Sequence, residues 1–328
     1  MATNILQRPD VEDIHPRDIV AAGELESCNH LLDDHAALEA FYEDNGYVLL
    51  RGVFDLDAVA EARDAMLKVA SDLGLTEPGD ITGKWTGKAS PGGLEESPLY
   101  SGIAKKLLEH PASLAVLEKV LGEKPCAMPN VQYRAYPPHS AWGTVHQDGF
   151  YSPGIHDYKP VWVPLTPCSR AMGGLALAVK QNKRGYLHNT SKTSPFPIPK
   201  DAIPADSWAT TDYMPGDVLI VNPYTPHTGL ANTSDRLRLS FDSRVQSAAN
   251  PSAFAATVKS ATPTTLTVAI DDGGEKTFTV DEDTFIRVVN PGIRETLAGF
   301  EVYTKPGMRI VVVKDGDRAV MLRRAAEG

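Results

Sequence analysis

Cysteine is scarce in this sequence, and the few cysteines are not paired. The 328 residues include three, Cys28, Cys126 and Cys168, and no two of them form a C-x-x-C pair. A small, odd number of widely separated cysteines is typical of free thiols in a reducing compartment rather than of a disulfide framework. A zinc ribbon is excluded as well, because it needs closely spaced pairs of ligands.

Long apolar runs and targeting signals are also missing. The longest apolar stretches are as long as a β-strand, whereas a membrane-spanning helix needs about 20 consecutive apolar residues. Residues 1–10 lack the apolar segment of a signal peptide, and residues 325–328 match no targeting sequence. We therefore expect a cytoplasmic protein that does not associate with a membrane.

Positive charge is in deficit. Lysine and arginine number 32 against 42 aspartates and glutamates, so the formal net charge is −10 at pH 7. An acidic chain is poorly suited to bind nucleic acid or an anionic membrane, which argues against both as partners. A local basic pocket for an anionic small molecule is compatible with this charge. The hydrophobic content of 42% is ordinary for a globular protein with a substantial core.

Periodic patterns divide the chain into a first, mainly helical part and a later, mainly β part. Apolar residues recur at helical spacing in 32–45, 56–73 and 101–121, and a short strand is expected at Tyr47–Leu50. From residue 127 onward the predicted strands are 131–136, 161–165, 175–179, 217–221 and 237–245. This order predicts a mixed α+β, mainly β fold: a cupin-like double-stranded β-helix, or jelly roll, with flanking N-terminal helices.

The composition changes again near residues 247–253, where alanine, serine, asparagine and proline cluster. Residues 271–274, Asp-Asp-Gly-Gly, are a strong hairpin signal. Beyond residue 255 the expected strands are 264–270, 276–280, 285–289, 308–313 and 318–323. We predict two domains, residues 1–250 and a small all-β domain, a β-barrel, at residues 255–325. The second has neither histidine nor cysteine, so the chemistry is expected in the first.

A histidine and an aspartate stand two residues apart at His146 and Asp148. In an extended segment, residues two apart point to the same side, so the imidazole and the carboxylate can reach one metal ion. Two histidines and one carboxylate on one face of Fe(II) are the ligands of non-haem ferrous oxygenases, which keep the opposite face open. An H-x-D motif alone is weak evidence, because a surface turn with a capping aspartate has the same sequence.

A second segment supplies another histidine. Residues 215–222 have the pattern of a turn followed by a buried strand, and His227 comes soon after it. A returning strand over 236–241 places Arg236 and Arg238 on one face and apolar side chains on the other. A guanidinium is the natural partner of a carboxylate on a dicarboxylic co-substrate. For either arginine alone, a solvated strand face is the better interpretation.

Together these motifs resemble the phytanoyl-CoA dioxygenase family. The match consists of the H-x-D motif at 146–148, Pro-Gly-Asp at 215–217 with its apolar strand, His227, and Arg238. Further similarity lies in the N-terminal strand at 45–53 and in two core segments, 162–165 and 173–175. The resemblance covers residues 35–246.

The resemblance implies a non-haem Fe(II)/2-oxoglutarate-dependent dioxygenase whose iron is held by His146, Asp148 and His227. Such an enzyme uses O₂, releases succinate and CO₂, and hydroxylates or desaturates an unactivated C–H bond. The substrate expected here is a small molecule, a specialised metabolite. Halogenating relatives have a small residue in place of the aspartate, so the presence of Asp148 disfavours halogenation.

The resemblance also implies a place for the co-substrate. It assigns the distal carboxylate of 2-oxoglutarate to Arg238, and it places Gln147, Trp162 and Thr228 close to the co-substrate. For Trp162 a simple core position is equally compatible with the sequence. Residues near the first iron ligands are candidates for the substrate pocket, although each is also compatible with a core or surface role. These candidates are Tyr133, Arg134, Trp142, Phe150, Tyr151 and His156.

Two alternatives stay open at this level. A cupin-like metalloenzyme that does not use 2-oxoglutarate would have no need of Arg238. A jelly roll that has lost catalysis would instead be a binding module. The C-terminal β-domain resembles accessory barrels that mediate oligomer contacts, which suggests a homo-oligomer formed through that domain.

Overall fold

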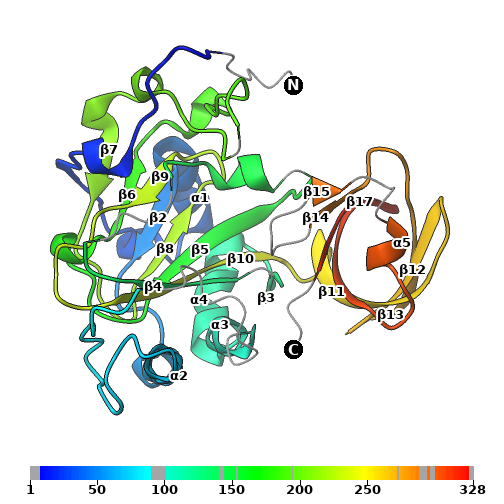
Figure 1. The fold of residues 1–328 in the computed structure, drawn as a ribbon, viewed down its shortest axis with the longest axis horizontal. Helices are drawn as coiled ribbons and strands as arrows, with labels where there is room; N and C mark the ends of the chain where they lie inside the picture. The colour runs from blue at the N-terminus through cyan, green and yellow to red at the C-terminus, as the bar shows by residue number, and fades with distance from the viewer. Residues whose placement is uncertain are drawn as a thin grey trace.

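The architecture is given by a computed structural model. It describes residues 8–89, 101–129, 131–139, 144–152, 154–193, 195–271, 273–287, 294–295 and 300–324. Figure 1 shows the N-terminal helices and two sheets on one side of the molecule, and a third group of strands with one short helix on the other. Within these residues, no helix is both long enough and apolar enough to cross a membrane.

The N-terminal part of the described chain is helical, as predicted. Its α-helices are α1 His35–Asn45, α2 Leu56–Asp72, α3 Ser101–Leu108 and α4 Pro111–Leu121. The side chains of Asp34 and Asp55 accept hydrogen bonds from the first turns of α1 and α2, which satisfies N–H groups that have no partner within the helix. Gly46 ends α1 in the left-handed conformation.

The single helix predicted for residues 101–121 is wrong. The chain breaks at Glu109 and His110, and α4 begins with Pro111. Proline inside a helix removes a hydrogen bond and clashes with the preceding turn, whereas at the first position it costs nothing. The His110 ring accepts a hydrogen bond from the N–H of Ala112 at 3.4 Å and so caps the new helix. Two short helices therefore replace one.

Two sheets, formed mainly by strands that come after the helices, accompany them, so the mixed, mostly β character is confirmed. The larger sheet has the order β2-β8-β5-β10-β3, and β4 also pairs with β10. Its strands are β2 Tyr47–Leu50, β3 Pro125–Ala127, β4 Gln132–Tyr136, β5 Tyr158–Pro164, β8 Val218–Val221 and β10 Arg238–Ser247. The smaller sheet has the order β1-β7-β6-β9, with β1 Gly23–Glu24, β6 Leu175–Ala178, β7 Trp208–Thr210 and β9 His227–Gly229.

Strand β2 shows how the layers are stacked. Val48 and Leu50 belong to a core that the strand shares with the helices, whereas Tyr47 and Leu49 belong to a core that it shares with the smaller sheet. Because successive side chains of a strand point to opposite faces, the larger sheet is covered by helices on one face and by the smaller sheet on the other. All four residues of β2 are therefore buried, and the strand has a continuous apolar sequence.

The third group of strands forms a seven-stranded sheet in the order β13-β12-β11-β16-β17-β14-β15. A further pairing between Thr279 of β13 and Arg318 of β17 links strands at distant positions in that order. The strands are β11 Ala253–Ala261, β12 Thr265–Ile270, β13 Gly274–Thr279, β14 Phe285–Arg287, β15 Arg294–Glu295, β16 Arg309–Asp315 and β17 Arg318–Arg324, and a short helix, α5, spans Phe300–Tyr303.

This sheet has its own core and one shared contact surface. Phe254, Val268 and Phe278 lie in a core formed by its own strands. A second cluster joins Val311 and Val313 of β16, together with Met321 of β17, to Met128 and Tyr158 of the preceding part of the chain. The seven-stranded sheet therefore packs directly against the beginning of β5.

Candidate active site

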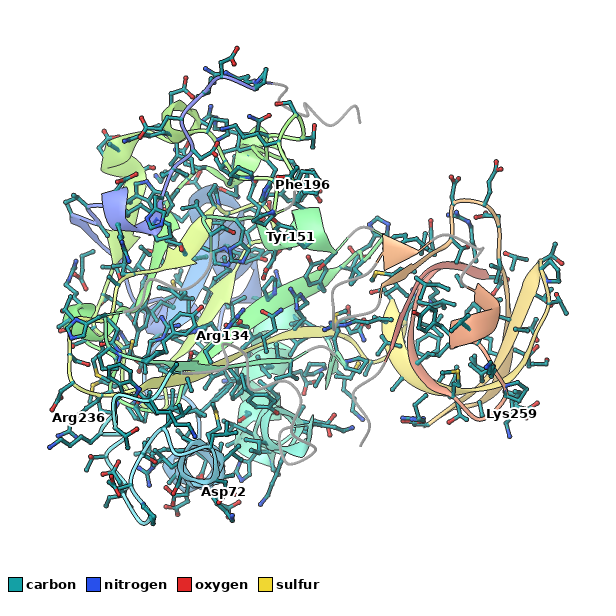
Figure 2. The ribbon with its side chains drawn as sticks, in the orientation of Figure 1. Asp72, Arg134, Tyr151, Phe196, Arg236 and Lys259 are labelled. Carbon is teal, nitrogen blue, oxygen red and sulfur yellow. The ribbon has the colours of Figure 1, made fainter. Side chains whose placement is uncertain are left out.

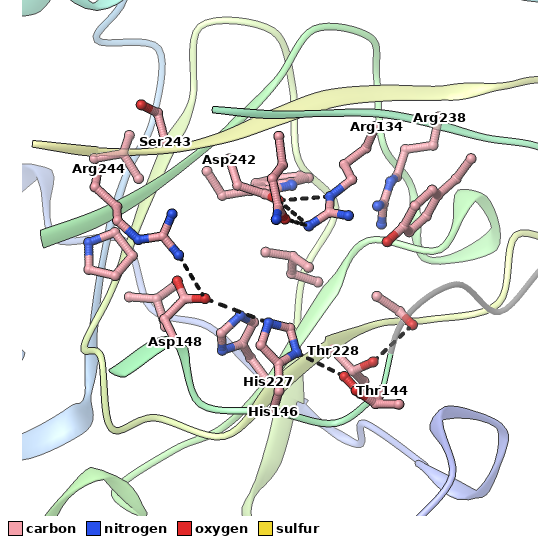
Figure 3. A pocket seen from close by; sticks show the side chains of 18 residues that line it. Arg134, Thr144, His146, Asp148, His227, Thr228, Arg238, Asp242, Ser243 and Arg244 are labelled. Atoms are coloured by element: carbon pink, nitrogen blue, oxygen red, sulfur yellow. Dashed lines mark hydrogen bonds and ion pairs between the residues drawn. The ribbon is translucent and has the colours of Figure 1, made fainter. Parts of the chain in front are cut away.

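A pocket opens between the two N-terminal sheets, and polar side chains from several strands converge on it. Figure 3 shows His146, Asp148 and His227 at one wall and arginines of β4 and β10 at the opposite wall. Strand β10 explains the second wall. Leu239 and Phe241 point into the core under the helices, so the alternate residues of the strand, including Arg238, face the pocket.

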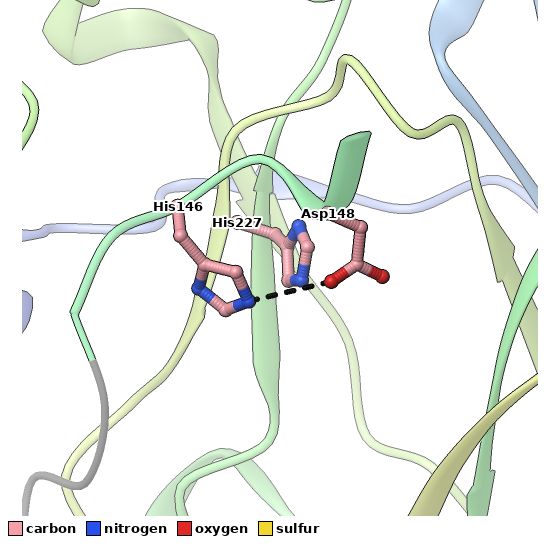
Figure 4. A group of neighbouring side chains, drawn as sticks. All are labelled: His146, Asp148 and His227. Atoms are coloured by element: carbon pink, nitrogen blue, oxygen red, sulfur yellow. Dashed lines mark ion pairs between the residues drawn. The ribbon is translucent and has the colours of Figure 1, made fainter. Parts of the chain in front are cut away.

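The two histidines come together through backbone pairing. The N–H of His146 donates to the carbonyl of His227 at 3.0 Å, and the N–H of His227 donates to the carbonyl of His146 at 2.9 Å. Their ring centroids are 4.3 Å apart, and His146 Nε2 lies 3.6 Å from Asp148 Oδ1. One ligand atom from each of the three residues lies within 4.8 Å of the other two (Figure 4). The structure thus brings together the predicted triad.

Asp148 reaches this point by a different route from the one predicted. It begins a short 3₁₀ helix, Asp148–Tyr151, instead of continuing an extended segment. The turn is held by the N–H of Gly149, which donates to the carbonyl of Pro223 at 2.9 Å. A side chain at Gly149 would lie 3.2 Å from that same carbonyl oxygen, so a glycine suits this close approach.

Hydrogen bonds to the backbone fix the orientation of both imidazoles. Nδ1 of His146 lies 2.8 Å from the carbonyl oxygen of Thr144, and Nδ1 of His227 lies 3.0 Å from that of Thr225. A carbonyl can only accept, so each Nδ1 carries a proton. This leaves Nε2 as the ring nitrogen that can bind a metal ion in each histidine.

The charges at the triad also suit a metal ion. Burial alone would raise the pKa of Asp148, but the positive charge of Arg244 and the nearby His146 together hold it well below its usual range. Burial, with His146 as a further cause, lowers the pKa of His227 to about 4. Near pH 7 the aspartate is anionic and His227 is neutral, which is the form that a metal requires. Two imidazoles and one carboxylate fit ferrous iron.

Arg238 is a buried cation held in a cradle. It is 1% exposed, it donates from Nη1 to the carbonyl of Gly173, and its guanidinium carbon lies 3.9 Å from the ring centroid of Tyr136. Its Nε has no hydrogen-bond partner, and among the described residues no carboxylate lies within 4.0 Å of it. Because an uncompensated buried charge is costly, this place suits an incoming carboxylate.

The other predicted co-substrate residues are divided. Trp162 and Thr228 line the pocket, and the indole Nε1 of Trp162 is buried without a partner among the described residues. Gln147 is buried but does not line the pocket. Its amide nitrogen donates to the carbonyls of Gly185 and Tyr224, and its oxygen accepts from the N–H of Leu187. These bonds hold the side chain against the 185–187 segment and outside the pocket lining, and the co-substrate contact of Gln147 stays a prediction.

Of the predicted substrate residues, Arg134 lines the pocket and Tyr133 does not. Nε of Arg134 lies 2.7 Å from Oδ2 of Asp242, which places an ion pair in the pocket wall. Tyr133 points to the opposite face of β4, where its hydroxyl accepts from the N–H of Ala104 within the helical core. Strand alternation therefore excludes Tyr133 from the pocket. Trp142 lies outside the described residues.

The remaining three candidates are not among the residues that line the pocket. The ring centroid of Tyr151 lies 6.2 Å from that of His146. Phe150 stacks on His188, with centroids 4.0 Å apart. His156 is exposed, and its carbonyl accepts from the hydroxyl of Ser252 at 3.2 Å. A role of these three residues in substrate binding stays a prediction.

The sequence prediction missed two charged residues of the pocket, Asp242 and Arg244. Both continue the alternation of β10 that begins with Arg238 and passes through Ser240. Extending the polar face of the predicted strand from residue 240 to residue 244 would have found them. Nη2 of Arg244 lies 3.4 Å from Oδ1 of Asp148.

A third missed residue is His188, which supports the triad from behind. The N–H of Gln147 donates to Nε2 of His188 at 3.2 Å, and Nδ1 of His188 lies 2.6 Å from the carbonyl oxygen of Phe196. Burial lowers the pKa of His188 to about 4, so this ring is neutral near pH 7. It holds the backbone of the residue that stands between His146 and Asp148.

Comparison with known proteins gives this geometry a family context. The model of the phytanoyl-CoA dioxygenase family matches residues 42–240. The 1-deoxypentalenic acid 11-beta-hydroxylases of Streptomyces exfoliatus and Streptomyces arenae are each 33% identical, over 247 and 245 residues. Each alignment covers 69% of this chain and 86% of the relative.

Solved structures share the fold. EctD from S. alaskensis in its apo form aligns with a TM-score of 0.51 at 17% identity, covering 76% of this chain and 89% of that one. The same enzyme with 2-oxoglutarate and 5-hydroxyectoine gives a TM-score of 0.50 at 16% identity, covering 76% and 88%. At such identities the likeness shows only that the fold is shared.

Gly229 is predicted to set the affinity for 2-oxoglutarate. A Cβ at this position would lie 3.1 Å from Nη1 of Arg238 and 3.0 Å from the Tyr136 ring, so Gly229→Ala would push the guanidinium out of place. We expect its KM for 2-oxoglutarate to rise roughly tenfold, equivalent to about 1.4 kcal/mol. Gly102→Ala, at an exposed glycine with open space around it, serves as the control. If Gly229→Ala and Gly102→Ala have equal KM values for 2-oxoglutarate, the position of the Arg238 guanidinium does not set this affinity and the prediction is wrong.

His188 is predicted to make stability depend on pH. Because its folded pKa of about 4 lies below the ordinary 6.5, the unfolded chain binds the proton more tightly, and stability falls as pH drops below 6.5. For this group we expect a loss of about 2 kcal/mol between pH 6.5 and 5. Urea unfolding of the metal-free protein between pH 6.5 and 5 measures the free energy of unfolding. We expect this free energy to change less with pH in His188→Gln than in wild type or in His30→Gln, at an exposed histidine. An equal change with pH in all three proteins would contradict the role of His188.

Proposed function

We propose roles in catalysis for the residues of this pocket, because the chain belongs to the phytanoyl-CoA dioxygenase family. It is a 2-oxoglutarate-dependent dioxygenase that uses Fe(II), 2-oxoglutarate and O₂. It oxidises a small molecule, a specialised metabolite, by hydroxylation or a related oxygenation. Bound iron supplies the activation of O₂ that couples decarboxylation of 2-oxoglutarate to succinate and CO₂ with oxidation of a substrate C–H bond.

His146, Asp148 and His227 hold the iron in this proposal. The observation that supports it best is the state of the three ligands before any metal arrives. Two imidazole Nε2 atoms and a carboxylate already face one point, and each side chain is fixed by a separate hydrogen bond or ion pair. Little rearrangement is then needed when iron binds.

Arg238 receives the distal carboxylate of 2-oxoglutarate, and Trp162 and Thr228 contact the rest of the molecule. The support is the buried guanidinium, which lacks a carboxylate partner in the described part of the chain, together with the unpaired indole N–H beside it. Tyr136 and Gly173 hold the guanidinium by stacking and by a hydrogen bond. They keep the cation in a water-poor place, where its attraction for a carboxylate is strong.

Arg134 contacts the substrate in this proposal, and the substrate carries a carboxylate or a similar anionic group. Arg134 and Asp242 present a cation and an anion side by side in the pocket wall, with about a quarter of each side chain exposed (25% and 28%). The relatives in Streptomyces are named for a carboxylic acid substrate. Tyr151, which packs edge-on against His146, is proposed to border the substrate on the iron side.

Finer features of the architecture are part of the same proposal. The two N-terminal sheets form a jelly roll, and residues 1–250 are the oxygenase domain. Residues 255–325 are a small barrel, which the extra pairing between β13 and β17 supports because it joins the strand order into a ring. This domain also provides the candidate surface through which the chain forms a homo-oligomer.

The proposed function is tested by substrate-dependent formation of succinate from 2-oxoglutarate under air, with 1-deoxypentalenic acid as the first substrate and other carboxylic acids after it. Asp148→Ala is expected to lose this activity. Arg238→Ala is expected to bind iron normally while its KM for 2-oxoglutarate rises about 10- to 100-fold, because a charge-assisted hydrogen bond is lost.

Arg236→Ala is the matched control, since Arg236 stands two residues earlier and its side chain is 43% exposed. Figure 2 shows it at the edge of the molecule, far from Arg134. Normal succinate formation by Asp148→Ala would refute the iron site. A larger effect of Arg236→Ala than of Arg238→Ala would refute the co-substrate site.

A separate prediction concerns the substrate. Arg134→Met is expected to raise the KM for a carboxylate-bearing substrate about tenfold while leaving the KM for 2-oxoglutarate unchanged, and Arg134→Lys is expected to recover part of the loss. Initial rates with one ligand varied and the other saturating separate the two constants. If Arg134→Met raises the KM for 2-oxoglutarate instead, Arg134 is the co-substrate anchor and the assignment is wrong.

A further inference from the structure

Arg244 is a buried arginine of the pocket that is neither a proposed iron ligand nor a proposed contact of the co-substrate. It lies in β10 six residues beyond Arg238, which is about 20 Å along an extended strand. Figure 3 shows the two arginines on opposite sides of Asp242. Arg244 is therefore too far from Arg238 to share a carboxylate with it, and it needs another explanation.

The environment of Arg244 fixes its place. Its side chain is 9% exposed, and its backbone carbonyl accepts from the N–H of Met128 at 2.8 Å. On the other side β10 pairs with β5, where Pro160 stands opposite Arg244 and Tyr158 opposite Gln246. Tyr158 and Met128 are both in the cluster against which the seven-stranded sheet packs. With its backbone held between these contacts, Arg244 has little freedom to move.

The charged end of Arg244 points at an iron ligand. Nη2 lies 3.4 Å from Oδ1 of Asp148, and the same oxygen lies 3.6 Å from Nε2 of His146. Among the described residues, Arg244 is the one lysine or arginine within 4.0 Å of this carboxylate. The guanidinium thus contacts the carboxylate oxygen that faces the other ligands.

We infer that Arg244 is a positioning residue for the iron site: it holds the carboxylate of Asp148 turned toward His146 and His227. The inference rests on the proposed function of the triad. Asp148 stands at the start of a 3₁₀ turn, and among the described residues its carboxylate contacts the side chains of His146 and Arg244 rather than a group of the turn. A charge-assisted contact from a rigid strand supplies that constraint, as hydrogen-bonded partners do for the ligands of many metal sites.

Arginine is better suited to this task than lysine. A guanidinium is planar and always charged, so a small rotation keeps at least one N–H directed at the carboxylate. The ammonium group of lysine keeps the charge but not the planar fork. Replacing Arg244 by lysine therefore separates the effect of charge from the effect of orientation.

The test is an anaerobic titration of the full-length protein with Fe(II) at saturating 2-oxoglutarate, followed by the charge-transfer absorption of the complex. For Arg244→Met we expect the Kd for Fe(II) to rise about 10- to 100-fold, the usual effect of removing a partner of a metal ligand. Arg244→Lys is expected to show a smaller rise and a shifted absorption band. Arg236→Met, at an exposed arginine just before the same strand, is expected to match wild type.

Two further readouts separate positioning from general damage. At saturating Fe(II) the KM for 2-oxoglutarate is expected to be normal in Arg244→Met, because Arg238 is untouched. The thermal unfolding of the metal-free variants shows whether they are folded. If Arg244→Met does not fold, Arg244→Lys decides the question through its Kd and absorption band.

The inference is overturned if Arg244→Met has the Kd for Fe(II) and the absorption band of wild type. If Arg244→Met is unfolded, the same result in Arg244→Lys overturns it. A wild-type protein that binds no Fe(II) would overturn the proposed iron site itself. A wild type that binds Fe(II) tightly beside an Arg244→Met variant that binds it equally well would refute only the role of Arg244.

Discussion

The site depends on the alternation of β10 between two covered faces. Leu239, Phe241 and Val245 are fixed in the core beneath the helices, so the intervening residues must face the pocket between the sheets. A shift of the strand by one residue would bury the charged side chains under the helices and expose the apolar ones. The hydrophobic core therefore sets the positions of Arg238, Asp242 and the strand's other charged residues.

The charged side chains of β10 that face the pocket include both cations and an anion. A cation at each end, Arg238 and Arg244, flanks the anion Asp242, which is paired with Arg134 from the neighbouring strand. Asp148 pairs with Arg244, whereas Arg238 has no carboxylate partner in the described part of the chain. Among these arginines of the described chain, Arg134 and Arg244 each have a carboxylate partner and Arg238 does not. An acidic protein can therefore build a local anion site without a basic surface.

The part of the site that lies on strands could be predicted from sequence, namely His227 in β9 and Arg238 in β10. Strand β2 has the predicted bounds, and His146, Asp148, His227 and Arg238 line one pocket, although Asp148 begins a 3₁₀ helix. Spacing along a strand translates directly into a direction in space. The same holds for most strands of the C-terminal sheet, whose β-branched runs and hairpin turn are local signals.

Where the structure differs from the sequence prediction, the difference has a physical cause. Gln147 stands between two iron ligands in sequence, but its side chain turns away to bond three backbone groups that only the folded chain brings near. Tyr133 was assigned by proximity in sequence, whereas the pleat of β4 directs it into the helical core. His188 is distant in sequence from the motif that it supports, and strands of three residues, such as β7 and β9, are too short to show periodicity.

The central claim is that one pocket holds iron at the triad and 2-oxoglutarate at Arg238. A crystal structure of the protein prepared anaerobically with Fe(II) and 2-oxoglutarate tests it most directly. The account predicts a single metal ion bound to Nε2 of His146, Nε2 of His227 and a carboxylate oxygen of Asp148, with the distal carboxylate of 2-oxoglutarate on Arg238. A metal ion without Asp148 as a ligand, or 2-oxoglutarate with its distal carboxylate on Arg134, would contradict it.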